Sequence, residues 1–146
     1  MPKSVFVAAA IGVAACITVG AAAYAEAETV ATMTKAPYGV YLTADEGHAI
    51  YMFTADHNGI SACEGACAKA WPPVMTSGKP EAGPGINASL LGTLQRGDGM
   101  QVTYDGKPLY YFVGDQGAGT TAGQDITHFG GSWYLVSPSG NKIDPD

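Results

Sequence analysis

The chain has 146 residues, which leaves room for one domain. Hydrophobic residues make up 47% of it and charged residues only 14%, and it contains twenty glycines and nine prolines. This composition excludes a helical bundle or coiled coil, and it is too apolar for a disordered protein. A net charge of −6 without any run of basic residues argues against nucleic-acid binding, which needs clustered lysine and arginine.

An export signal is predicted for residues 1–25. A cationic start is followed by an uncharged stretch that ends in Ala-Tyr-Ala at residues 23–25, so we expect cleavage after Ala25. Two alternatives stay open. Residues 13–16 (Val-Ala-Ala-Cys) resemble a lipobox in which Cys16 would carry a lipid, and an uncleaved segment would have about the ~20 residues that a membrane span needs. Each alternative places the rest of the chain outside the cytoplasm, in the periplasm or beyond the cell, with membrane contact only through this segment.

Two similar halves of strands are predicted downstream. In the first, residues 38–43 and 48–54 alternate in polarity around a turn, which is typical of a β-hairpin. In the second, residues 100–104 and 107–113 flank an Asp-Gly turn in the same way. Residues 132–137 form the last predicted strand.

These halves look like an internal duplication of roughly 60 residues, because residues 42–56 align with 102–115 with one residue missing from the second turn. We therefore predict a mainly β, small single domain over residues 38–146, with half-repeats at about 38–75 and 98–137. Residues 26–37 are predicted to be a linker. Residues 114–131 hold six glycines and are predicted to be a long loop, of the kind that often binds a ligand or acts as a lid.

Cys63 and Cys67 lie four residues apart in a predicted short helical turn. They are the two cysteines left once the signal is removed, and an even number in an exported chain favours a disulfide. Closing so small a loop should contribute roughly 2 kcal/mol. The alternative is a copper or zinc site in which two thiolates are joined by His57 or Met75.

A six-residue motif, Tyr-x-Phe-x-x-Asp, occurs once in each half. Together with the cysteine pair and Trp-Pro-Pro at residues 71–73, it resembles the bacterial secreted or lipoprotein repeat family that is defined by Tyr-x-(Phe/Trp/Tyr)-x-x-Asp. The resemblance implies an envelope or secreted protein and no particular reaction. The motif residues are Tyr51, Phe53 and Asp56 in the first copy and Tyr110, Phe112 and Asp115 in the second.

Two roles can be assigned to the motif. Tyr and Phe two residues apart share one face of a strand, where they can bury a large aromatic area, and the aspartate can fix the following turn by accepting backbone N–H groups. Alternatively, Asp56 and Asp115 flank a shared ligand or cation site. Tyr41, Tyr104 and Tyr111 are either ordinary strand residues or an exposed aromatic platform for a partner.

The sequence contains none of the catalytic motifs that we sought: no Gly-x-Ser-x-Gly elbow, haem-attachment motif or phosphate loop. We therefore expect a non-catalytic binding or structural module without a cofactor, whose ligand lies in the envelope or outside the cell. The alternative function is periplasmic copper or zinc binding through Cys63, Cys67 and a nearby histidine.

Overall fold

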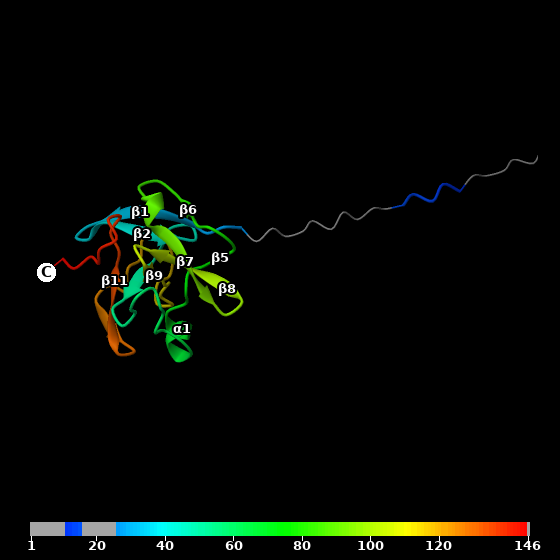
Figure 1. Ribbon diagram of the computed structural model, residues 1–146. Coiled ribbons are helices and arrows are strands. Elements are labelled where there is room, and N and C mark those ends of the chain that lie inside the picture. Colours follow the sequence, from blue (N-terminus) through cyan, green and yellow to red (C-terminus); the bar gives the residue numbers. More distant parts are fainter. Residues whose placement is uncertain (1–10, 16–25, 146) are drawn as a thin grey trace, which may run out of the picture.

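The computed structural model describes residues 11–15 and 26–145 (Figure 1). Cleavage after Ala25 and lipidation of Cys16 fall outside the described residues. Within the described part, no helix is both long and apolar enough to cross a membrane. The elements in chain order are β1 (Thr29–Lys35), β2 (Gly39–Ala44), β3 (His48–Ala49), β4 (Tyr51–Phe53), α1 (Ala66–Ala70), β5 (Met75–Thr76), β6 (Glu81–Ala82), the 3-10 turn η1 (Ala88–Leu90), β7 (Leu91–Arg96), β8 (Gly99–Tyr104), β9 (Lys107–Pro108), β10 (Ile126–His128) and β11 (Gly131–Leu135).

The mainly β prediction is confirmed, and each half begins with the same three-stranded meander. In the first half β1 pairs with β2 and β2 with β3, all antiparallel. In the second half β7 pairs with β8 and β8 with β9 in the same manner. The two predicted hairpins are therefore present, and each gains one further strand at its N-terminal side.

The first of these added strands corrects the predicted linker at residues 26–37. Residues 29–35 form β1, with five residues in register against β2, and β6 pairs in parallel with the start of β1. Threonine and valine at residues 29 and 30 favour an extended backbone, and Val30 is fully buried. The domain therefore begins before residue 38, and the second half begins at β7 rather than near residue 98.

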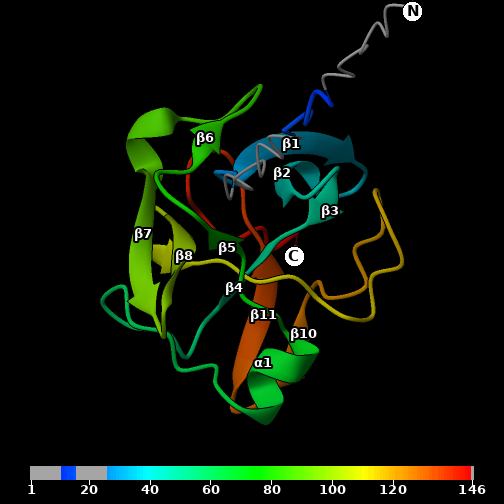
Figure 2. The same cartoon turned by 90° about the vertical axis from the view of Figure 1, so that its right-hand side faces the viewer.

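The two halves interlock after their meanders. The predicted strand 48–54 divides at Ile50, because β3 pairs with β2 whereas β4 pairs with β11 from the other half. Tyr51 and Tyr110 pair with each other across the middle of the molecule, with N–H···O=C distances of 2.8 and 3.0 Å. The backbone of residues 72–74 bonds to residues 109–111, which mirrors the β11–β4 pairing. Each half therefore adds a segment to the other, and Figure 2 shows β4 and β11 side by side in the centre of the domain.

Four aromatic rings form a continuous stack inside this arrangement. Trp71 and Trp133 lie face to face with ring centroids 3.9 Å apart and an angle of 3° between their planes. Phe53 covers Trp133 at 4.0 Å, and Phe112 covers Trp71 at 4.2 Å. Aromatic pairs contribute about 0.5–1.5 kcal/mol each beyond the area they bury, so this stack is a major source of cohesion between the halves.

The tyrosines considered as an exposed platform lie elsewhere. Tyr41 and Tyr104 are fully buried, and Tyr111 is half-buried. The platform hypothesis is therefore wrong, because Tyr41 and Tyr104 lie in the hydrophobic core and Tyr111 packs against it.

Candidate functional site

The two motif copies exchange their hydrogen bonds. Tyr51 donates its hydroxyl proton to Oδ2 of Asp115 at 2.6 Å, and Tyr110 donates to Oδ2 of Asp56 at 2.7 Å. Each tyrosine thus bonds to the aspartate of the other copy. Burial, followed by the neighbouring aspartate, raises the pKa of both hydroxyls well above the ordinary tyrosine value.

Each aspartate also holds the loop that follows it. Oδ1 of Asp56 accepts the N–H of Ala62 at 2.7 Å, and Oδ1 of Asp115 accepts the N–H of Ala122 at 2.7 Å. These contacts match the turn-fixing role considered for the motif. Desolvation raises the pKa of Asp56 despite these hydrogen bonds and the nearby Arg96 charge.

A polar cluster beside Asp56 contains residues that the sequence analysis missed. The Arg96 guanidinium donates to Ser61 Oγ at 2.7 Å, to Gln101 Oε1 at 3.1 Å and to the carbonyl of Cys63. Ser61 Oγ lies 2.6 Å from the Tyr110 hydroxyl. Arg96 is the single arginine of the sequence, a signal that could have drawn attention to it.

The predicted disulfide is confirmed, with Cys63 and Cys67 joined and both buried among the aromatic residues beside α1. While this bond is closed, neither sulfur is a thiolate, so the copper or zinc hypothesis lacks its two principal ligands. His57 is exposed on a loop, and Met75 lies on β5 beside Gln101. In the described residues no three histidine, cysteine or acidic side chains gather where they could hold a metal ion.

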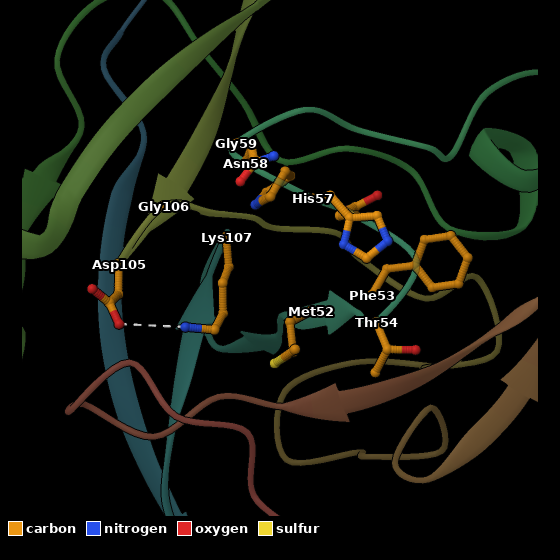
Figure 3. Close-up of a pocket in the computed structure, with 11 residues that line it drawn as sticks. Met52, Phe53, Thr54, His57, Asn58, Gly59, Asp105, Gly106 and Lys107 are labelled. Carbon is orange, nitrogen blue, oxygen red and sulfur yellow. Dashed lines mark hydrogen bonds and ion pairs between the residues drawn. The ribbon is translucent and has the colours of Figure 1, made fainter.

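A groove of about 470 Å³ opens next to the first motif copy (Figure 3). Its apolar part is formed by Met52, Phe53 and Pro108, and its polar walls are residues 56–59 and 105–107. Lys107 Nζ lies 3.3 Å from Asp105 Oδ2 on one wall, and Figure 3 shows His57 on the opposite wall. We call this hollow the Met52 groove.

The duplicated structure provides a direct comparison for this groove. In the alignment of the two halves, Met52 corresponds to Tyr111 and Lys107 corresponds to His48. We call the position around Tyr111 and His48 the counterpart side. There the His48 and Tyr111 rings meet edge to face, with centroids 6.5 Å apart.

The turn glycines show the same difference in packing. A Cβ placed on Gly47 would meet Ala118 at 3.1 Å and the Met33 sulfur at 3.3 Å, whereas a Cβ on Gly106 would meet nothing within 4 Å. The counterpart side is therefore filled, and the Met52 groove is open.

The Gly-rich loop that follows the second motif copy packs onto the core. Tyr51 Oη accepts the N–H of Gly123, and a Cβ on Gly123 would approach the Tyr51 ring to 2.8 Å and the Trp71 ring to 2.9 Å. Its last part forms β10, which pairs with β11. The prediction of one continuous loop over residues 114–131 is therefore wrong for residues 126–128 and for Gly131, where β11 begins.

Of the comparisons with curated proteins, solved structures and family models, the comparison with family models gives a match. No curated protein and no solved structure matches the chain. A family model described as a secreted repeat of unknown function matches twice, at residues 32–75 and at residues 92–137. The two matches coincide with the two halves of the structure and cover more than half of the sequence, and the chain belongs to this family of secreted repeats.

Proposed function

We propose that this protein is a non-catalytic binding module that acts outside the cytoplasm, and that the Met52 groove is its ligand site. The observation that carries the proposal is the difference between the two halves. On the counterpart side the His48 and Tyr111 rings meet and the Met33 and Ala118 side chains approach the turn, whereas the equivalent position beside Met52 is open.

Loss of packing at one of two equivalent positions has a cost in stability. An open groove leaves the apolar side chains of its lining in contact with water, so the protein loses the hydrophobic stabilisation that burying them would give. The equivalent position on the counterpart side is filled, so the fold does not require an open groove here. We therefore attribute the open groove to ligand binding. Its volume of about 470 Å³ also lies within the range of small-molecule sites.

The polar cluster near the groove supports a non-catalytic role. A nucleophilic serine needs a base that accepts its proton, and the group closest to Ser61 is the Tyr110 hydroxyl. Burial raises the pKa of Tyr110, and its hydroxyl already donates to Asp56, so Tyr110 is a poor base at neutral pH. Arg96 also donates a hydrogen bond to the Ser61 oxygen. The cluster therefore has the character of a structural brace.

The test is a screen of a fragment panel (phenols, aliphatic alcohols, amides and monosaccharides) by two-dimensional amide NMR. Binding fragments are expected to shift the amides of residues 52–59 and 105–107. The double variant Met52→Tyr with Lys107→His installs the residues of the counterpart side, and we expect it to abolish these shifts because the groove closes.

A matched control makes the same two side-chain changes away from the groove. Met75 on β5 and Lys69 on α1 are both exposed, so Met75→Tyr with Lys69→His should leave fragment binding unchanged. Shifts that persist in the groove-filled variant, or a panel without a single fragment that perturbs the groove, would contradict the proposal.

A further inference from the structure

We infer that the ligand of the Met52 groove presents a planar aromatic ring without a negative charge. This inference rests on the proposed function and specifies its ligand class. The fold itself shows what fits at this position, because the counterpart side is occupied by aromatic rings from Tyr111 and His48. In the Met52 groove the equivalent residues are Met52 and Lys107, whose side chains are flexible and carry no ring.

The two substituting side chains are well suited to contact a ring from outside the protein. A methionine thioether makes favourable contacts with aromatic rings, and an ammonium group is attracted to a ring face. Met52 and Lys107 both line the groove and are both half-buried. Elsewhere in this chain the same kind of contact occurs, since Lys142 Nζ lies 4.5 Å from the centroid of the Tyr134 ring.

The charges around the groove restrict the ligand further. Asp56 and Asp105 line it, with Lys107 already paired to Asp105 at 3.3 Å. An anionic ligand would meet these two carboxylates, whereas a neutral ring with a hydroxyl group can donate a hydrogen bond to one of them. A phenol therefore represents the class best.

The experiment compares p-cresol with 4-methylcyclohexanol, which has a similar shape and hydroxyl group but no π system. Both are titrated against the wild-type protein while the amides of residues 52–59 and 105–107 are followed by NMR. We expect p-cresol to bind roughly tenfold more tightly, as sulfur–aromatic and cation–π contacts together predict. Equal affinity for the two compounds would overturn the aromatic class.

A variant isolates the contribution of the charge. Lys107→Leu keeps an apolar side chain, removes the ammonium group and adds no sulfur, so the preference for p-cresol over 4-methylcyclohexanol should fall by severalfold. Lys69→Leu on exposed α1 is the control and should leave that preference unchanged. A preference that is identical in Lys107→Leu and wild type would contradict the assigned role of Lys107.

Failure of this inference can be separated from failure of the proposed function. A groove that binds other fragments of the panel but not p-cresol overturns the aromatic class alone, whereas a groove that binds none overturns both. N-acetyltyrosinamide distinguishes the source of the ring. Tighter binding than p-cresol supports a tyrosine of a polypeptide partner, and weaker binding supports a free aromatic compound.

Discussion

Tyr51 and Tyr110 connect the two copies of the motif at the level of single atoms. Because each hydroxyl donates to the aspartate of the other copy, Oδ2 of each carboxylate receives its hydrogen bond from the other half. The motif thus joins the two repeats, because each copy contributes a tyrosine to one of the exchanged hydrogen bonds and an aspartate to the other. These hydrogen bonds form between the copies, so the spacing within one copy does not reveal them. The backbone pairing of Tyr51 with Tyr110 brings the exchanged partners together.

Double-mutant cycles test this exchange. Tyr51→Phe and Asp115→Ala are expected to show a coupling of about 1 kcal/mol in the free energy of unfolding by urea, and so are Tyr110→Phe and Asp56→Ala. The pair Tyr51→Phe and Asp56→Ala lies within one motif copy and shares no hydrogen bond, so its effects should be additive. Coupling within a copy and none between copies would refute the exchanged arrangement.

Asp56 provides a test by pH. Desolvation raises its pKa in the folded state, so the folded protein binds this proton more tightly than the unfolded chain does. Its contribution to stability is therefore fully present below the unfolded pKa and is lost as the pH rises through the folded pKa. Relative to Asp56→Asn, the wild type should gain stability as the pH falls through the interval just above the ordinary aspartate pKa. Urea unfolding of both proteins between pH 7 and pH 4 measures this difference, and a change of opposite sign would show that the hydrogen bonds to Asp56 outweigh its desolvation.

The strands show where sequence patterns suffice and where they fail. Alternation in residues 48–54 and the Asp-Gly turn at 105–106 identified the hairpins, because a period of two residues determines which face is buried. It does not determine the pairing partner, so the division between β3 and β4 could not be foreseen. β1 was missed because its sequence is rich in threonine and only Val30 is buried among its seven residues, which gives a weak alternation.

The loop of residues 114–125 packs against the aromatic core, and this close approach requires glycine at position 123. Gly123→Ala should lower the free energy of unfolding by about 1–3 kcal/mol, because the added methyl would overlap the rings of Tyr51 and Trp71. Gly117 lies in the same loop, and a Cβ there would meet nothing within 4 Å. Gly117→Ala is therefore the control, with an expected effect within about 0.5 kcal/mol. Equal effects of the two variants in urea unfolding would mean that the loop does not press on the stack.

At the scale of the whole molecule, the duplication produces one domain instead of two. The Trp71–Trp133 stack, the β4–β11 pairing and the exchanged motif bonds all cross between halves. The repeat and the aromatic character of its strands could be predicted, because short stretches of sequence are sufficient to recognise both. The groove could not, since it depends on residues about 50 positions apart and on how Met52 and Lys107 differ from their counterparts in the folded state.

The interlocked fold is tested most directly by dividing the chain within the segment that connects the two halves. Residues 26–86 and 87–146 are produced separately, and urea unfolding is followed by near-ultraviolet circular dichroism of the tryptophans. Each fragment alone should lack a cooperative transition, because its tryptophan and its motif tyrosine have lost their partners, and an equimolar mixture should regain one transition. A cooperative transition in either fragment by itself would contradict the interlocked fold, and with it the comparison of halves on which the groove assignment depends.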